Sequence, residues 1–298
     1  MGGWFRASAR VHPRDPLAFA EAPSRFLRGL LFFIRLHLAE QLPNQQSALT
    51  ESHGTESHGA VPVGLGGFSS PRTPHPSLPM GRRALKRIDR ELDLSSYLLE
   101  LDDVPRPCTS ATLFGNEAPL EVEVGSGKGL FMRRAAAAEP GHNFLGIEIA
   151  RKYARFAAAN LARRELTNAK MIVGDGLRLF NEHLPDGSLD AVHVYFPDPW
   201  WKKRHRKRRV MRESFVRRIE QVLRPGGWLH FWTDVGEYFD ESIELLRSAT
   251  TLDGPHPVRE APAEDDLDYR THFERRMRLA DEPVYRSQFR RPSSAESV

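Results

Sequence analysis

The feature that most constrains the fold is a regular alternation of short apolar strands with amphipathic helices. The pattern runs through five units from residue 120 to residue 248. Parallel strands joined by helices pack into one sheet with helices on both faces, so the alternation predicts a doubly wound, mostly parallel α/β sheet. A first strand begins at Leu120, and further strands are predicted at 143–149, 169–173, 189–196 and 228–233, with helices at 128–138, 150–164, 211–223 and 236–248.

Five positions that could carry chemistry fall at or just after the carboxyl ends of these strands. They are Gly125, Glu148, Asp175, Asp198 and Asp234. In a parallel sheet these ends share one edge, where doubly wound folds bind their ligands. Any one carboxylate could be a helix cap or a solvated loop residue, and Asp175 taken alone is better explained as a cap. Their coincidence at one edge predicts a ligand crevice there.

The first of these strands runs into a turn with glycines at 125, 127 and 129, which let the backbone approach a ligand closely. The dinucleotide fingerprint would need a further glycine at position 130, which is Leu. The phosphate-loop motif would need Ser or Thr at position 129. Glu148 follows the turn by about 20 residues, where doubly wound folds place an acceptor for ribose hydroxyls.

The stretch from Val192 to Val210 joins three unlike features. An apolar run ends in Pro-Asp-Pro around Asp198, Trp200 and Trp201 follow, and a block of eight basic residues comes next. A charge run alone is usually a solvated loop. Here aromatic faces that could stack a base adjoin a positive field that could hold phosphates, which predicts a nucleic-acid interface. Trp200, Trp201 or Tyr195 could provide the stacking face, and a core position for Trp200 is an equal alternative.

Composition excludes several classes of protein. The formal net charge is only +4, but the basic residues are clustered, so the local field is stronger than the net charge suggests. Cys108 is the only cysteine, which excludes an intramolecular disulfide and the usual thiolate metal site. The most apolar stretch, Phe26 to Leu38, is short and carries two arginines and a histidine. We therefore expect a cytoplasmic protein with no membrane and no metal partner; no pattern predicts its oligomeric state.

The turn Glu-Val-Gly-Ser-Gly-Lys-Gly from Glu123, the Gly-Ile-Glu-Ile that contains Glu148, Phe-Pro-Asp-Pro-Trp with its basic run, and Thr271-x-Phe-Glu together resemble the bacterial tRNA (guanine-N7)-methyltransferases. The resemblance covers about residues 80 to 291. The glycine turn is common to class I methyltransferases, whereas the Pro-Asp-Pro-Trp block is close to diagnostic. The resemblance implies the seven-stranded, Rossmann-like sheet of that class, with an antiparallel edge strand that we place at 284–289.

The resemblance also implies an activity: methyl transfer from S-adenosylmethionine to N7 of a guanine in the variable loop of tRNA, forming 7-methylguanosine. Asp198 would be catalytic and would face both cofactor and guanine. Trp201 stands where many relatives have His, and His272 where Lys is frequent. The implied cofactor contacts are Glu123, Gly125, Gly127, Glu148, Asp175 and Asp198; the implied substrate contacts are Lys202, Asp234, Thr271, His272, Phe273 and Glu274; and the stretch expected to lie against tRNA is His205, Arg206, Lys207, Arg208, Arg209 and Val210.

Four segments are expected along the chain. Residues 1–79 contain no lysine and show little apolar periodicity, so we expect a disordered extension. An equal alternative is that translation starts at Met80 and the extension is spurious. Residues 80–118 would form a basic lead-in arm, short and helical or extended, against the edge of a methyltransferase domain at 119–291. Residues 292–298 would be a disordered tail.

Two other functions stay open at this point. One is a methyltransferase that acts on another RNA, a protein or a small molecule, which would keep the cofactor site and change the substrate. The other is a non-catalytic RNA-binding protein on a methyltransferase fold, which would bind no S-adenosylmethionine. Intact carboxylates at Glu148, Asp175 and Asp198 favour an enzyme over the second alternative.

Overall fold

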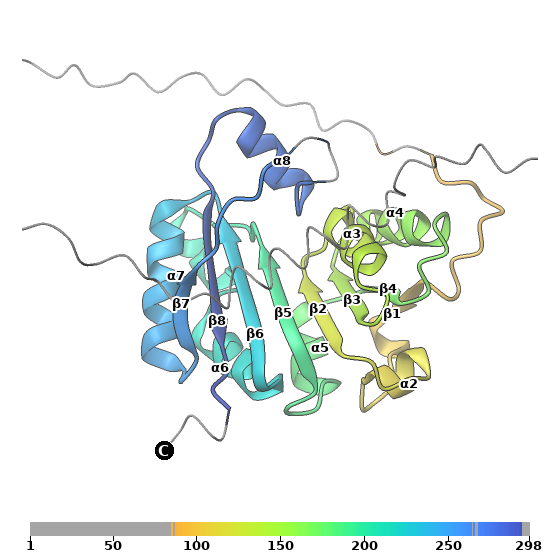
Figure 1. The fold of residues 1–298 in the computed structure, drawn as a ribbon, viewed down its shortest axis with the longest axis horizontal. Coiled ribbons are helices and arrows are strands. Elements are labelled where there is room, and N and C mark those ends of the chain that lie inside the picture. Colours follow the sequence, from red (N-terminus) through yellow and green to blue (C-terminus); the bar gives the residue numbers. More distant parts are fainter. Residues whose placement is uncertain (1–84, 86, 264, 266–267, 294–298) are drawn as a thin grey trace, which may run out of the picture. The chain divides into compact units, whose positions relative to one another are not determined.

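The structure is a computed structural model that describes residues 85, 87–263, 265 and 268–293 (Figure 1). The expectations for residues 1–79, for the start of the lead-in arm and for the last five residues lie outside these ranges. The four segment boundaries therefore stay predictions. None of the helices in the described ranges is long and apolar enough to cross a lipid bilayer.

The described residues fold around one eight-stranded sheet with the order β1-β4-β3-β2-β5-β6-β8-β7 (Figure 1). The first six strands pair in parallel, while β8 is antiparallel to both β6 and β7. The predicted doubly wound, mostly parallel sheet is confirmed. The strands are β1 (Leu98–Glu100), β2 (Leu120–Val124), β3 (Asn143–Glu148), β4 (Ala169–Val173), β5 (Leu189–Tyr195), β6 (Leu223–Thr233), β7 (Asp253–Pro257) and β8 (Tyr285–Arg290).

Two strands were not foreseen, and they change the details of the prediction. Three-residue β1 pairs with β4 and adds an eighth strand, so the lead-in arm contains a strand as well as a helix, α2, closer to its end. β7 contains Pro255 and Pro257, and proline is rare inside a sheet. An outermost strand needs backbone donors on one side only, so it tolerates proline. β7 covers β8, and the antiparallel strand is consequently next to last in the sheet.

Helices cover both faces of the sheet, and each face has its own apolar core. The larger core lies under α5, α6 and α7 and includes Leu179, Phe215 and Ile243. The smaller core lies under α3 and α4, on the other face, and includes Phe131 and Leu161 (Figure 1). The helices are α2 (Ser110–Phe114), α3 (Leu130–Ala138), α4 (Arg151–Ala162), α5 (Gly176–Glu182), α6 (Glu213–Val222), α7 (Gly236–Ala249) and α8 (His272–Leu279).

Helix α3 begins two residues later than predicted because of Gly129. This residue has a φ of 69°, in the left-handed region that glycine adopts without a steric penalty. A Cβ at this position would lie 2.5 Å from the Cβ of Ala157 on α4. Gly129 therefore allows both the turn and the close packing of α3 on α4.

Replacing Gly129 with Ala should lower the free energy of unfolding by about 2–4 kcal/mol, because strain and overlap with Ala157 add together. Chemical denaturation measures this difference. Gly125→Ala has similar backbone strain with open space around the new methyl group, and it should cost about 1–2 kcal/mol. Gly141→Ala, which meets neither problem, should stay within about 0.5 kcal/mol of the wild type. Equal losses in Gly129→Ala and Gly125→Ala would refute the packing argument.

Candidate functional site

The carboxyl ends of the central parallel strands bring the predicted acidic residues to one edge of the sheet. Glu148 ends β3 and Asp175 follows β4. Asp198 follows β5 and Asp234 follows β6. These four strands flank β2, which ends in the glycine turn. The structure thus assembles the predicted edge from segments far apart in the sequence.

Glu148 ties the glycine turn to the helix that follows β3. One carboxylate oxygen accepts from the backbone N–H of Gly127 at 2.9 Å, and the other accepts from that of Ala150 at 2.8 Å. Each oxygen keeps a second lone pair for a further donor. Glu148 is therefore placed both to shape the turn and to accept from a ligand hydroxyl.

Glu123 lies in β2 directly beneath the turn and is only 3% exposed. Within the described part of the chain, its Oε2 atom has no hydrogen-bond partner. Burial raises the pKa of this carboxyl to about 8, and the charge of Glu148 adds to the increase, while Ser126 opposes it. Methyl groups added at Gly125 and Gly127 would meet no atom within 4 Å. An unpaired buried carboxylate beside an open glycine turn fits a ligand that carries a positive charge.

The other two carboxylates of the edge differ in their surroundings. Asp175 accepts from the backbone N–H of Leu177 at 2.8 Å and caps α5, as favoured from the sequence alone. Its side chain is exposed, so capping leaves an oxygen accessible. Asp234 is half-buried, and this burial raises its pKa.

The Pro-Asp-Pro-Trp turn after β5 is held in a strained backbone conformation. Phe196 and Trp200 have φ angles of 50° and 42°, a region that costs non-glycine residues about 1–3 kcal/mol each. Asp198 lies between them and is exposed. No hydrogen bond or ion pair holds its carboxylate among the residues that the structure describes. Strain at both ends of the turn fixes the position of a carboxylate that is open to a ligand.

The aromatic residues near this turn differ in how far they are exposed to solvent. Trp200 is partly exposed; its ring lies 5.8 Å from that of His205 and 5.1 Å from the Arg208 guanidinium. Trp200 thus contacts the basic segment, and the alternative of a core position is wrong. Trp201 is 62% exposed. Tyr195 is 6% exposed, so its proposed use as a stacking face is wrong as well.

The basic run divides into an exposed part and an anchored part. Residues 203–208 form a short 3₁₀ helix, in which Lys207 and Arg208 are exposed. The Arg209 side chain is buried, donates to the Pro199 carbonyl at 2.7 Å and pairs with Glu241 of α7. Val210 packs against the larger core. The structure does not place these last two side chains for contact with RNA, because both serve to hold the turn.

Arg206 combines properties of the exposed part and the anchored part of the basic run. It is exposed, but it pairs with Glu237 and Glu241 at 3.0 Å each. Lys202, predicted to contact substrate, is exposed at the start of the same segment, and His205 is partly exposed beside Trp200. The segment that follows Asp198 along the chain thus presents several exposed cations.

The predicted substrate segment Thr271-x-Phe-Glu forms the start of α8. The Thr271 hydroxyl accepts from the backbone N–H of Glu274 at 3.0 Å and caps the helix. The Phe273 ring lies 4.9 Å from that of Phe196, so α8 begins beside the strained turn. His272 is exposed next to it. A Thr-x-x-Glu pattern is a helix-start signal, and it could have predicted α8 from the sequence.

Glu274 differs from its predicted role as a substrate contact. It is 3% exposed and accepts from the backbone N–H of Arg270 at 2.6 Å. It also pairs with Arg286 at 3.3 Å and with Arg278 at 3.5 Å. Its carboxylate is therefore occupied inside the protein, and it stabilises the segment that carries Thr271 and Phe273.

Comparison with known proteins agrees with this geometry. A family model described as "Putative methyltransferase" matches residues 117–287. The tRNA (guanine-N(7)-)-methyltransferase of Rhodopirellula baltica is 52% identical over 226 residues, which span 74% of this chain and 83% of that protein. The chain belongs to the tRNA (guanine-N7)-methyltransferase family. The member from Alkalilimnicola ehrlichii is 35% identical over 192 residues, 62% of this chain and 78% of that protein. The expected family is confirmed, and the matched residues include every candidate site residue.

The buried carboxyl of Glu123 leads to a pH-dependent stability. A carboxyl whose pKa is raised by folding stabilises the fold when protonated, and this contribution disappears as pH rises from its ordinary value of 4.5 to about 8. Glu123→Gln removes the effect, so the variant should gain stability relative to the wild type by up to roughly 1.4 kcal/mol per pH unit across this window. Denaturation at pH 5, 6.5 and 8 measures the difference. Glu117→Gln, at an exposed site, should follow the wild type, and a constant Glu123→Gln difference would contradict the assignment.

Proposed function

We propose that this chain transfers the methyl group of S-adenosylmethionine to N7 of a guanine in the variable loop of tRNA, forming 7-methylguanosine. One observation carries the proposal: the exposed carboxylate of Asp198 follows β5, the neighbour of the strand β2 that ends in the glycine turn, and it precedes an exposed basic segment with aromatic rings; Glu123 in β2 has a buried oxygen with no partner among the described residues. The 52% identity to a tRNA (guanine-N(7)-)-methyltransferase supports the same reaction. A chain that modifies tRNA would act in the cytoplasm.

The residues at the glycine turn fit the cofactor. S-adenosylmethionine, when bound, supplies a methyl group activated by the positive charge of its sulfonium. Glu123 offers a buried carboxylate to a cationic group of the ligand, and Gly125 and Gly127 offer open backbone beside it. Glu148 would accept from ribose hydroxyls, and Asp175 would accept from the adenine side with the oxygen that does not cap α5.

Methyl transfer to guanine N7 does not require a general acid or a general base. Guanine N7 has a free lone pair, so no base is needed to make it nucleophilic, and catalysis comes mainly from alignment and exclusion of water. Positive charge develops on the guanine ring during transfer. The Asp198 carboxylate would stabilise that charge and could accept from the guanine N1 or its exocyclic amine. The strained turn would keep this carboxylate in position.

The substrate would be held from two sides. Thr271 and Phe273 at the start of α8, with Asp234 and Lys202 nearby in the same edge, would contact the guanine and its surroundings. His272 is accessible for the same role. The exposed residues of the basic run would bind phosphates, and Trp200 or Trp201 could stack on an extruded base, a contact that contributes roughly 1–3 kcal/mol.

The proposed reaction is tested with labelled S-adenosylmethionine and an unmodified tRNA transcript. A matched transcript has its variable-loop guanine replaced by adenine. Label should appear at guanine N7 of the first transcript and should be absent from the second. Asp198→Asn should lower the rate by roughly 100-fold, because the developing charge loses its carboxylate.

The outcomes separate the alternatives. Equal label in both transcripts would mean a methyltransferase with another target base. Label in ribosomal RNA or protein but not in tRNA would change the substrate class. Cofactor binding with no label in any of these would point to a small-molecule substrate, and absence of cofactor binding would favour a non-catalytic RNA-binding protein.

The basic segment leads to a prediction about salt. The double variant Lys207→Gln, Arg208→Gln should bind tRNA more weakly. The slope of log binding constant against log salt concentration should become less negative by about 1.5–2, since each lost phosphate contact removes roughly one released counterion. The control is Arg217→Gln with Arg247→Gln, exposed cations on α6 and at the end of α7 away from the site. Filter binding from 50 to 300 mM salt measures both slopes. Equal slopes for the two variants would remove the basic segment from the interface.

A further inference from the structure

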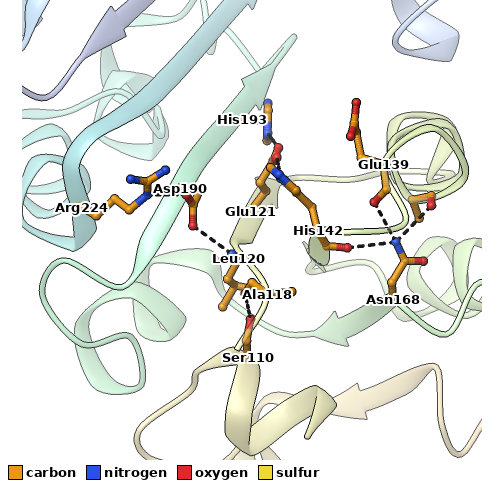
Figure 2. A network of polar contacts seen from close by, with 11 residues as sticks. Ser110, Ala118, Leu120, Glu121, Glu139, His142, Asn168, Asp190, His193 and Arg224 are labelled. Carbon is orange, nitrogen blue, oxygen red and sulfur yellow. Dashed lines mark hydrogen bonds and ion pairs between the residues drawn. The ribbon is translucent and has the colours of Figure 1, made fainter. Parts of the chain in front are cut away.

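A series of hydrogen bonds, buried at its centre, connects the core of the sheet to the residue that precedes α8. Arg270 donates from Nη1 to the Tyr195 hydroxyl at 2.9 Å, and the Tyr195 hydroxyl lies 2.9 Å from His193 Nδ1. His193 Nε2 lies 2.7 Å from the Glu121 carboxylate. Figure 2 shows one end of this series of hydrogen bonds, where the Glu121 carboxylate lies between the side chains of His193 and His142. We call Glu121, His193, Tyr195 and Arg270 the relay.

The hydrogen bonds of the relay have one consistent direction. The Arg270 guanidinium can only donate, so the Tyr195 hydroxyl accepts from it and keeps its own proton for His193. His193 then accepts at Nδ1 and donates from Nε2 to Glu121. Burial lowers the pKa of His193, which favours the neutral ring that this pattern needs. The relay thus links a partly buried cation to a partly buried carboxylate through two buried, neutral groups.

The surroundings keep water away from the relay. Phe131 of α3 lies 4.4 Å from the His193 ring and 5.3 Å from the Tyr195 ring, and His230 stacks on His193 at 4.8 Å. The Arg270 guanidinium lies 5.2 Å from the Trp232 ring. At the buried His193 and Tyr195 side chains a lost hydrogen bond is not readily replaced by one to water, so these two residues hold their neighbours in place.

The relay ends where the substrate segment begins. Arg270 precedes Thr271, which caps α8. The backbone N–H of Arg270 donates to the Glu274 carboxylate at 2.6 Å. The segment that carries Thr271 and Phe273 therefore has two internal anchors: Glu274 with its arginines, and Arg270 with the relay. The relay reaches that segment from β5, the same strand that leads into the turn of Asp198.

We propose that the relay positions the Thr271–Phe273 segment against the Asp198 turn, with Tyr195 as a positioning residue for guanine binding. This inference rests on the proposed function, because it assigns the segment a guanine to hold. Tyr195 touches neither substrate nor cofactor in this proposal. It acts through Arg270, and its hydroxyl is the one group that both halves of the relay share.

Tyr195→Phe tests the proposal, because it removes that hydroxyl and keeps the buried ring. Its KM for tRNA should rise roughly tenfold, the size expected from a lost hydrogen bond to a charged group, while the dissociation constant for S-adenosylmethionine stays within about twofold. In the substrate-free protein, backbone hydrogen exchange should accelerate in residues 270–279 and stay unchanged in α4. Tyr269→Phe is the matched control; this neighbouring tyrosine is also buried and lies outside the relay, and it should leave all three quantities unchanged.

Each other outcome decides against the relay. Unchanged exchange in α8 would show that the hydroxyl anchors nothing there. Faster exchange in α8 with an unchanged KM for tRNA would show an anchor without a part in guanine binding. Parallel losses in cofactor affinity and in exchange protection throughout the domain would show general destabilisation. If the wild type does not methylate tRNA, the proposed function fails, and the exchange measurement on substrate-free protein still decides whether the relay anchors α8.

Discussion

Parallel pairing of β2 with both β3 and β5 is the constraint on which the site depends. The registers Val124 with Ile147 and Val124 with Val194 make these three strands end at nearly the same height. The next residues along each strand are consequently the glycine turn, Glu148 and the Pro-Asp-Pro-Trp turn. A shift of one strand by two residues would preserve the sheet and separate these groups by several ångströms. The hydrophobic core therefore specifies the site indirectly, by fixing the registers.

Three glutamates, two of them buried and Glu121 partly buried, have different roles. Hydrogen bonds from two histidines more than offset the burial of Glu121 and hold its pKa well below the usual range. Glu274 accepts from a backbone N–H and pairs with arginines. Glu123, on the same face of β2 as Glu121, has an oxygen without any such partner within the described residues, and its pKa is raised. The fold stabilises the charges of Glu121 and Glu274 internally, whereas Glu123 keeps an oxygen available for a ligand.

The fold was predictable from the sequence to the extent that apolar periodicity controls it. Strands β2 to β6 and helices α3, α4 and α6 follow directly from spacing, and the acidic edge follows from the parallel arrangement of the strands. β1 is too short to show a period, and the prolines of β7 are tolerated only because that strand is outermost, which no local pattern reveals. The start of α8 carries a capping signal, Thr271-x-x-Glu274, that predicts a helix there, although the same residues were interpreted only as a substrate motif.

The sequence predicted correctly which residues lie at strand ends, and it failed where the surroundings of a side chain decide its accessibility. Asp198 and Glu148 occupy the expected edge. Tyr195 lies at the end of an apolar strand, and only the packing of α3 over it shows that the ring is inaccessible. Arg209 looks like its neighbours in the sequence, yet the position of α7 turns it into an anchor of the turn. Such distinctions depend on contacts between segments distant in the chain.

The pairing of Arg206 with Glu237 and Glu241 has a consequence for the rate of tRNA capture. A phosphate that takes Arg206 must first displace two carboxylates, which then face the incoming polyanion with their own charges uncompensated. Arg206 therefore adds little to the long-range attraction that speeds encounter, because its field is already cancelled at a distance. If this segment binds tRNA as proposed, the first contacts would fall to Lys207 and Arg208, which form no ion pair within the described part of the chain, and Arg206 would exchange partners only after docking has begun. Residues of the basic run that look equivalent in the sequence would therefore contact tRNA one after another.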